Sequence, residues 1–220
     1  MFKVLITDSI SDKGITLLKS HNLQILDYTN KVKDFSEVLS QIDGWIIRSG
    51  TKITEKEIYK AKKLQVIGRA GVGTDNIDIK SCTDRGILVM NMPDGNTISA
   101  AEHTITLMAS LLRNIHIGHE STIKNQWLRN KLVGNELRNK VLGVVGLGKI
   151  GQEVIKRAIS FEMTIIGYDP YVNQGIMNKD LIKLVDFETI LLESDIITLH
   201  IPLLDSTKDI INKESFKKMK

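Results

Sequence analysis

Short apolar runs alternate with amphipathic segments along the first 90 residues of the chain. The apolar runs are typical of buried strands, and segments with apolar residues every three or four positions are typical of helices. The predicted strands are 3–7, 23–26, 45–49, 65–69 and 87–90, and the predicted helices are 12–21, 34–42, 54–64 and 77–86. Strands that alternate with helices predict βαβ units with right-handed crossovers and therefore a parallel sheet.

A longer amphipathic segment follows at 96–115. Ser99 and Glu102 have the spacing of a capping box, so we expect the helix to start there. Its apolar stripe consists of Ile98, Ala101, Ile105, Met108, Leu112 and Ile115. Because the pattern changes after this helix, we expect it to lie between two domains. Residues 116–140 are more polar and irregular, with Trp127 as their large anchor.

A second alternation starts at residue 141. The predicted strands are 140–146, 164–169 and 195–202, and the predicted helices are 150–161, 187–194 and 212–220. We expect the strand at 195–202 to complete a βαβαβ unit, and we place the boundary near 97–100. The fold class is α/β, with domains at 1–98 and 99–220.

Composition narrows the class of protein further. The net charge of +4 is spread over many lysine-rich segments, which favours a solvated basic surface over a nucleic-acid interface and suits a small anionic substrate. Cys82 is the single cysteine, so no intrachain disulfide forms, and we expect a buried thiol in a reducing cytosol. We predict a cytoplasmic protein with no signal peptide, no membrane span and no metal site.

The segment "VLGVVGLGKIGQEV" (141–154) places Gly146, Gly148 and Gly151 between a predicted strand and a predicted helix. This G-x-G-x-x-G spacing in that context predicts a dinucleotide-binding loop. Gly146 would permit the tight turn, Gly148 would leave room for a pyrophosphate, and Gly151 would let the helix pack closely. The alternative is a tight strand–helix turn that binds nothing.

Two further features support the dinucleotide interpretation. The amides of Lys149 and Ile150 would point at the phosphates from the helix N-terminus, where the helix dipole favours an anion. Asp169 lies at the end of the next predicted strand, where a carboxylate would accept the ribose hydroxyls. It would repel a 2′-phosphate, so NAD is favoured over NADP. The alternative for Asp169 is a turn residue before Pro170.

Two glycine-containing loops follow predicted strands in the first half of the chain. Arg48 offers a fork for a carboxylate or phosphate, and Gly50 would let a ligand approach the backbone. The amides of Gly71, Val72 and Gly73 could form an anion nest. Both loops could equally be plain glycine turns. None of the five histidines has a nearby carboxylate in a relay pattern, so we expect structural roles for them.

Five segments resemble the D-isomer-specific 2-hydroxyacid dehydrogenases. They are "IIRSGTKIT", "VIGRAGVGTDNIDI", "NMPDGNTISAAEHTITLM", "NKVLGVVGLGKIGQEVIKRAISFEMTIIGYDP" and "SDIITLHIPLLDSTKDIINKESFKKMK". The resemblance implies a flavodoxin-like substrate domain interrupted by a Rossmann-type NAD-binding domain, which is incomplete in this chain. The substrate would lie in the cleft between the two domains.

The resemblance also assigns roles to individual residues. It implies substrate contacts from Arg48, Ser49, Val72, Gly73 and Asn96. It implies cofactor contacts from Val72, Gly146, Gly148, Lys149, Ile150, Gly151, Asp169, Ile201 and Pro202. Trp127 and Arg129 match a segment of the family's dimer interface, so we expect a homo-oligomer that is at least a dimer.

The family's catalytic Arg, Glu and His lie beyond Lys220, so we expect no catalytic residue within this chain. The chain therefore has the pattern of a truncated product or fragment of a longer enzyme. The resemblance implies NAD-dependent oxidation of a small anionic D-2-hydroxy acid, first of all 3-phosphoglycerate. The alternatives are a glyoxylate/hydroxypyruvate or D-lactate enzyme of the same family, and an NAD-binding chain without turnover.

Overall fold

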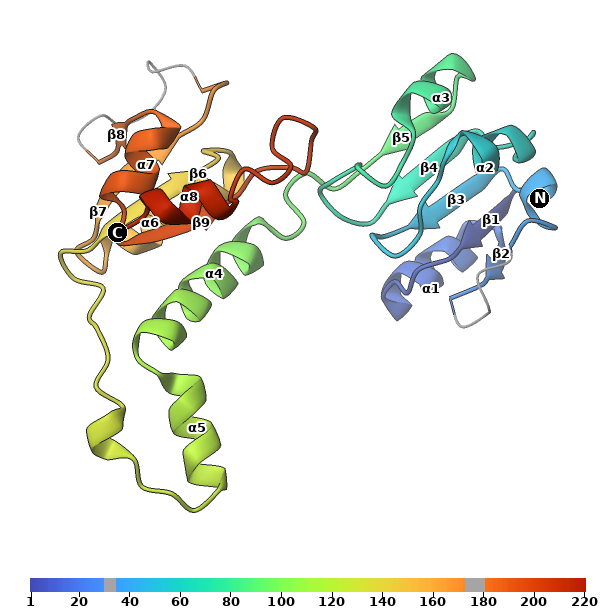
Figure 1. Ribbon diagram of the computed structural model, residues 1–220. Coiled ribbons are helices and arrows are strands. Elements are labelled where there is room, and N and C mark those ends of the chain that lie inside the picture. The colour runs from blue at the N-terminus through green and yellow to red at the C-terminus, as the bar shows by residue number, and fades with distance from the viewer. Residues whose placement is uncertain (30–34, 173–180) are drawn as a thin grey trace. The chain divides into compact units, whose positions relative to one another are not determined.

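The computed structural model describes residues 1–29, 35–172 and 181–220 (Figure 1). The chain folds into two compact units, Met1–Asn96 and Thr97–Lys220. Each unit has its own parallel sheet and its own apolar core. The assignment of substrate to the first unit and of NAD to the second stays a prediction at this point.

The first unit is a five-stranded parallel sheet with the order β2-β1-β3-β4-β5. Its strands are β1 (Lys3–Ile6), β2 (Gln24–Asp27), β3 (Gly44–Ile47), β4 (Val66–Arg69) and β5 (Leu88–Met90). Its helices are α1 (Asp12–Ser20), the 3-10 helix η1 (Leu39–Gln41), α2 (Glu55–Lys60) and α3 (Ile79–Asp84). This strand order is the flavodoxin-like one, whose switch point lies between β1 and β3. The predicted fold class is confirmed.

The helices α1, α2 and α3 begin at residues whose side chains accept hydrogen bonds from backbone N–H groups of the first turn. The Ser11 hydroxyl accepts the Gly14 N–H at 3.3 Å and starts α1. Thr54 and Glu57 form a capping box at α2. The Asp78 carboxylate accepts the Ser81 N–H at 2.9 Å, and this hydrogen bond lowers the pKa of Asp78. Each cap satisfies an N–H that has no partner within its helix.

The predicted helix at 34–42 is wrong for the described residues. Asp34 lies outside them, and the segment from Phe35 onward forms a turn and then η1. Phe35 packs edge-on against the buried Trp45, and tertiary contacts of this kind override the local helical pattern. Leu39 and Ile42 instead anchor it directly in the core.

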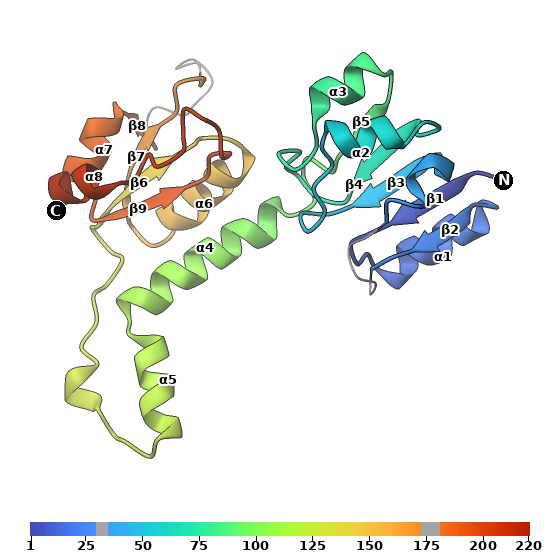
Figure 2. The same ribbon diagram turned by 45° about the vertical axis from the view of Figure 1, so that its right-hand side comes forward.

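One side of the first sheet carries the core of the unit. Leu5, Trp45 and Ile67 lie in neighbouring strands on this side and are fully buried. They pack against residues of η1, α2 and α3. The Trp45 indole N–H donates to the Thr7 hydroxyl at 3.0 Å, which satisfies its one polar atom. Figure 2 shows α2 and α3 on this side of the sheet and α1 on the other.

The second unit has a four-stranded parallel sheet with the order β8-β7-β6-β9. Its strands are β6 (Val141–Val145), β7 (Thr164–Tyr168), β8 (Lys183–Leu184) and β9 (Ile196–Leu199). Its helices are α4 (Thr97–Leu112), α5 (Ile115–Ile123), the 3-10 helix η2 (Arg129–Lys131), α6 (Lys149–Ile159), α7 (Phe187–Glu193) and α8 (Lys213–Lys218). This is the beginning of the Rossmann strand order 3-2-1-4.

The position of β9 corrects one sequence prediction. The strand expected to complete the first βαβαβ unit pairs with β6 and not with β7. The third position is taken by the two-residue strand β8, which the sequence pattern did not reveal. β9 therefore lies across the switch point from β7, where doubly wound sheets bind their ligands.

The helix predicted at 96–115 is present as α4, which ends at Leu112, and Ile115 already begins α5. α4 begins at Thr97, so Ser99 is already its third residue and the predicted capping-box start is wrong. The burial of Thr97 and Ala101 starts the helix where the chain enters the second unit. α5 then covers residues predicted to be irregular, after a reversal at Asn114, which has a φ of 53°.

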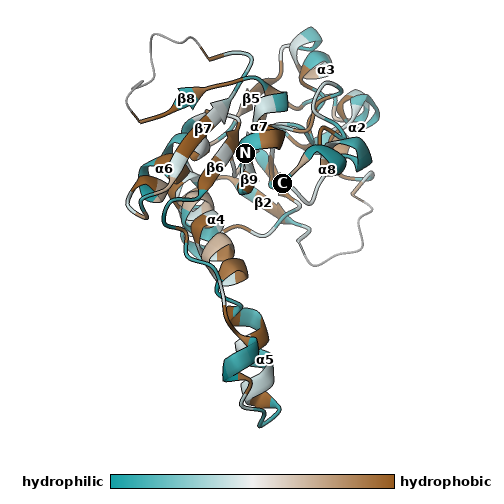
Figure 3. Ribbon diagram, turned by 60° about the vertical axis from the view of Figure 1, so that its left-hand side comes forward, coloured by the Kyte–Doolittle hydropathy of each residue, from teal (hydrophilic) through white to brown (hydrophobic). Residues whose placement is uncertain are grey.

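α4 packs on α6 through Ala101 and Met108, whereas α5 projects from the body of its unit (Figure 1). Apolar residues remain on both helices (Figure 3). Leu111, Ile115 and Ile123 are each more than half exposed, and Trp127 beyond α5 is 85% exposed.

Candidate functional site

The glycine loop joins β6 to α6. Gly146 has a φ of 93°, and a Cβ there would lie 2.5 Å from the His200 carbonyl oxygen. A Cβ on Gly151 would overlap the Gly146 carbonyl oxygen. Both glycines are therefore required by the packing of the chain itself, whether or not anything binds.

Gly148 differs from its two neighbours in the motif. It is exposed at the N-cap of α6 with an ordinary φ of −68°, and a Cβ there would meet no atom of the described residues within 4 Å. Neither strain nor packing requires glycine at this position. The open space above it, at a helix N-terminus, fits a bound pyrophosphate.

Asp169 lies at the end of β7 and holds the glycine loop. Its Oδ2 accepts the Leu147 N–H at 2.9 Å, and its Oδ1 accepts the Tyr171 N–H at 2.9 Å. The carboxylate therefore stabilises the glycine loop and also the turn that follows β7. Each oxygen has a further lone pair, so these bonds leave acceptor capacity for ribose hydroxyls. The ribose contact itself stays a prediction.

The segment after β9 completes this edge of the sheet. The His200 N–H donates to the Val145 carbonyl at 2.7 Å, and the Ile201 side chain lies against Gly146. Pro202 follows, exposed, and its carbonyl accepts the Thr207 hydroxyl at 2.5 Å. Burial lowers the pKa of the His200 imidazole, whose Nε2 lies 3.0 Å from the Thr198 hydroxyl. The structural role expected for this histidine fits these contacts.

The structure thus brings most of the predicted cofactor residues together at one edge of the second sheet. Gly146 and Gly148 lie in the loop, Lys149, Ile150 and Gly151 form the first turn of α6, and Asp169, Ile201 and Pro202 follow the flanking strands. Val72 belongs to the first unit.

Arg48 and Ser49 follow β3 at the switch point of the first unit, and both are exposed. The Arg48 side chain lines a hollow of about 600 Å³ with Ser9, Ser11, Ala70 and Met92. The Asn76 amide donates to the carbonyls of Arg48 and Thr51, at 2.6 Å each, and fixes the backbone of this loop.

Asp8, which the sequence analysis did not single out, lies beside Gly50 and binds the backbone of this loop. Its Oδ2 accepts the N–H groups of Arg48 at 2.6 Å and Thr51 at 3.0 Å. A Cβ on Gly50 would lie 2.5 Å from Asp8 Oδ1. An internal carboxylate thus already engages the amides of Arg48 and Thr51, and the approach of a ligand to the backbone at Gly50 stays a prediction.

The backbone groups of the anion nest predicted at residues 71–73 already form some hydrogen bonds within the chain. The Gly71 N–H donates to the Arg69 carbonyl at 2.8 Å, and the Asn91 amide donates to the Val72 carbonyl at 2.6 Å. The Arg69 guanidinium lies against Gly71, where a Cβ would overlap it. Its buried Nε has no hydrogen-bond partner among the described residues. Val72 and Gly73 are half-buried, and Asn96 is exposed at the end of the unit.

A signal for Asp8 and Arg69 was present in the sequence. Each ends or follows a predicted strand, and the carboxyl ends of parallel strands meet at one edge.

Across the described residues, every helix is too short or too polar to cross a membrane. The two sheets and the glycine loop define a doubly wound α/β protein with a dinucleotide-binding unit. A family model described as "D-isomer specific 2-hydroxyacid dehydrogenase, NAD binding domain" matches residues 105–220. The chain belongs to the D-isomer-specific 2-hydroxyacid dehydrogenase family, as the resemblance implied, and NAD is the cofactor of the matched domain.

Relatives named D-3-phosphoglycerate dehydrogenase match over nearly the whole chain. The Archaeoglobus fulgidus protein is 42% identical over 99% of this chain and 42% of its own length. The Bacillus subtilis protein is 42% identical over 100% of this chain and 42% of its own length. The chain thus spans less than half the length of these relatives.

A solved structure shares the fold as well. The NAD-dependent formate dehydrogenase from Staphylococcus aureus in complex with NAD has a TM-score of 0.88 and 28% identity, and the match covers 100% of this chain and 71% of that one.

Proposed function

We propose that this chain is part of an NAD-dependent dehydrogenase that oxidises D-3-phosphoglycerate to 3-phosphohydroxypyruvate. The single observation that carries this proposal is the whole-chain match, at 42% identity, to relatives named for that activity. A role in serine biosynthesis follows from the same match. The single buried Cys82 supports a cytoplasmic location.

The second unit would hold NAD at the carboxyl edge of its sheet. Gly148 leaves the space that a pyrophosphate needs, and the first turn of α6, with Lys149 and Ile150, presents amides to it. Asp169 would accept the ribose hydroxyls and would repel the 2′-phosphate of NADP. When bound, NAD supplies a hydride acceptor for the carbon that carries the hydroxyl.

The first unit would hold the substrate's anionic groups. Arg48 offers a bidentate fork, and its backbone is fixed by Asp8 and Asn76, so the loop backbone needs little ordering on binding. Ser49, Val72, Gly73 and Asn96 would complete the polar contacts. The family resemblance assigns the acid–base histidine and its partners to sequence beyond Lys220, so we expect the 220-residue chain to bind NAD without turnover.

The apolar residues left exposed on α4 and α5 support the proposal of a homo-oligomer. α5 has nine residues and projects from its unit, and so short a helix is marginal in water without packing partners. We expect sedimentation analysis to show at least a dimer. Leu111→Lys should shift the protein to a monomer. Leu192→Lys, at an exposed apolar position on α7, should leave the oligomeric state unchanged.

The function is tested by NADH formation from D-3-phosphoglycerate by the full polypeptide. D-glycerate and D-lactate with NAD, and glyoxylate with NADH, serve as competing substrates. We expect 3-phosphoglycerate to have the highest kcat/KM of these substrates. Arg48→Ala should raise the KM for 3-phosphoglycerate by about tenfold or more, because charge-assisted hydrogen bonds to the substrate are lost. A higher kcat/KM for lactate or glyoxylate would assign the chain to that branch of the family instead.

A further inference from the structure

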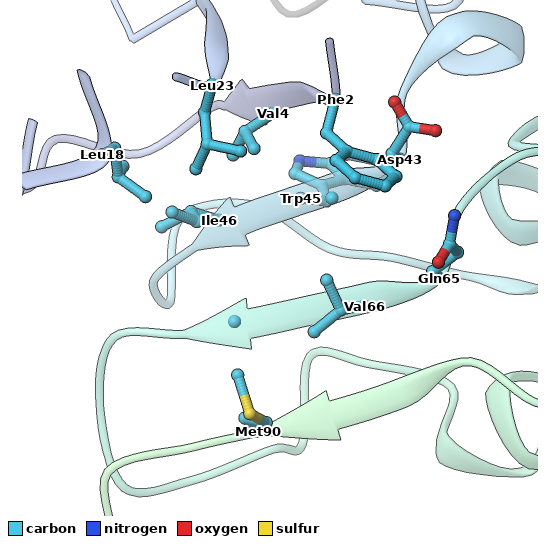
Figure 4. Close-up of a pocket in the computed structure, with 12 residues that line it drawn as sticks. Phe2, Val4, Leu18, Leu23, Asp43, Trp45, Ile46, Gln65, Val66 and Met90 are labelled. Carbon is cyan, nitrogen blue, oxygen red and sulfur yellow. The ribbon is translucent and has the colours of Figure 1, made fainter. Parts of the chain in front are cut away.

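Two hollows of the first unit differ in their chemistry. One, of about 320 Å³, is lined mostly by apolar side chains such as Val4, Val66 and Met90 (Figure 4). The other, of about 430 Å³, lies where β1, β2 and β3 end, and we call it the polar hollow. Its volume suits a small-molecule ligand, and it shares no residue with the hollow lined by Arg48. The residues that line the polar hollow are Thr7, Asp8, Tyr28, Thr29, Phe35, Gly50, Thr51 and Lys52.

Asp8 brings a carboxylate with one unengaged oxygen to the polar hollow. Its Oδ2 accepts the N–H groups of Arg48 at 2.6 Å and Thr51 at 3.0 Å. Its Oδ1 accepts no hydrogen bond from the described residues and lies beside Gly50, where a Cβ would come within 2.5 Å of it. Because glycine has no side chain there, Oδ1 is open to the hollow. A half-buried carboxylate oxygen with free lone pairs favours a cationic N–H donor.

Lys52 brings a positive charge to the same hollow. It directly follows Thr51 and is exposed, and its ammonium forms no ion pair with any described residue. Asp8 does not neutralise it, although both residues line the hollow and the Thr51 N–H beside Lys52 donates to Asp8. Opposite charges that border one space without meeting each other are complementary to a ligand that carries both signs.

The Thr7 hydroxyl adds a hydrogen-bond donor to the hollow. Its oxygen accepts the Trp45 indole N–H at 3.0 Å and the Thr51 hydroxyl at 2.8 Å. Both acceptor positions of the Thr7 oxygen are then filled, and its own O–H has no acceptor among the described residues, so it can donate to a ligand. The rings of Phe35 and Tyr28 form the apolar part of the lining.

We propose that the polar hollow binds a zwitterionic α-amino acid with an apolar side chain. The ligand's ammonium donates to Asp8 Oδ1, and its carboxylate accepts hydrogen bonds from Lys52 and the Thr7 hydroxyl. Its side chain lies against the ring of Phe35. A plain anion would face the like charge of Asp8, and a plain amine would leave Lys52 unpaired, so the two charges together select against both. This site is separate from the contacts proposed for NAD and phosphoglycerate.

Trp45 reports directly on this binding, because its indole N–H is bonded to Thr7. The chain has two tryptophans, and Trp127 is 85% exposed and outside the first unit, so its indole signal is an internal control. The ¹⁵N-labelled 220-residue chain is titrated with L-leucine, and the two indole N–H resonances are followed. We expect the Trp45 resonance to move saturably, because a Thr7 hydroxyl that donates to a carboxylate becomes a stronger acceptor. The Trp127 resonance should stay in place.

Ligand analogues and paired variants test the two charges. The analogue 4-methylpentanoate lacks the ammonium and 3-methylbutylamine lacks the carboxylate, so each should bind about tenfold or more weakly than L-leucine. Lys52→Gln should weaken L-leucine binding by about tenfold or more. Lys56→Gln, at an exposed position of α2 outside the hollow, is the matched control and should leave binding unchanged. Asp8→Asn keeps an acceptor oxygen, removes the charge and should weaken binding as much as Lys52→Gln does.

Any of three results would contradict the proposal. A Trp45 resonance that does not move up to the solubility limit of L-leucine would show that the hollow takes no amino acid. Equal affinity for 4-methylpentanoate and L-leucine would identify a plain anion site. Displacement of L-leucine by D-3-phosphoglycerate would assign the hollow to the substrate. The titration with L-leucine involves neither NAD nor turnover, so its failure is distinguishable from failure of the proposed function.

Discussion

The Asp169 carboxylate accepts the Leu147 N–H at 2.9 Å, so the end of β7 is tied to the glycine loop between β6 and α6. The residue expected to recognise the ribose thus also fixes the loop expected to bind the pyrophosphate. Stability of the loop and affinity for NAD should therefore respond together to changes at Asp169.

Two substitutions of Asp169 should separate the role of the carboxylate's charge from the role of its acceptor oxygens. Asp169→Ala leaves two backbone N–H groups without their acceptor, a loss of about 1–3 kcal/mol, and should weaken NAD binding as well. Asp169→Asn keeps one acceptor oxygen and removes the charge, so it should relax discrimination against NADP with a smaller loss of stability. Calorimetric titration with NAD and NADP, together with thermal unfolding, measures both. Unchanged affinity for both cofactors in the Ala variant would remove Asp169 from the site.

The glycines of the loop should divide into structural and binding positions. Gly146→Ala should destabilise the protein by about 1–3 kcal/mol from its dihedral alone, with a further clash against His200. Gly148→Ala should leave the free energy of unfolding within about 0.5 kcal/mol of the wild-type value but should weaken NAD binding. Chemical unfolding and NAD titration of the two variants check this. A stable Gly148→Ala protein with wild-type NAD affinity would contradict the pyrophosphate assignment.

Asp8 should prove important for the loop that carries Arg48. In Asp8→Ala, the N–H groups of Arg48 and Thr51 lose their shared acceptor, so we expect a loss of about 1–3 kcal/mol and a higher KM in the full polypeptide. Asp84→Ala, an exposed carboxylate at the end of α3, is the control and should change stability by less than about 0.5 kcal/mol. An Asp8→Ala protein as stable as the Asp84 control would show that these bonds contribute nothing.

His200 should make stability depend on pH. Burial lowers its pKa in the folded protein below the ordinary value of 6.5, so the unfolded chain binds the proton more tightly. The stability contributed by the neutral ring is therefore present above pH 6.5 and is lost as pH falls from there to the lowered pKa. Denaturant unfolding between about pH 5 and 7.5 should show this slope, and His200→Gln should flatten it. His21→Gln, at an exposed position, is the control and should keep the slope of the wild-type protein. If His200→Gln also keeps that slope, the titrating group lies elsewhere.

Local patterns in the sequence predicted much of this fold because they are periodic and short-range. All eight predicted strands occur, since each is a compact apolar run, and the G-x-G-x-x-G motif correctly marked a strand–turn–helix. The patterns failed where tertiary contacts overrode them. Ser99 has the spacing of a cap, yet burial of Thr97 starts α4 two residues earlier. β8 has two residues, too few for a periodic signal.

The sequence by itself determined the fold class and the dinucleotide loop, because strand–helix alternation and motif spacing are local properties, and the resemblance of its segments to a known family gave the family and supported NAD as the cofactor. Only the tertiary structure decided what each polar group at the sheet edges does, because hydrogen bonds such as Asp8 to Arg48 and Asp169 to Leu147 join residues 40 and 22 positions apart. It also decided which motif glycine is left for a ligand and which face of the first sheet carries the core. Exposure depends on what packs across the sheet, and no single strand encodes that.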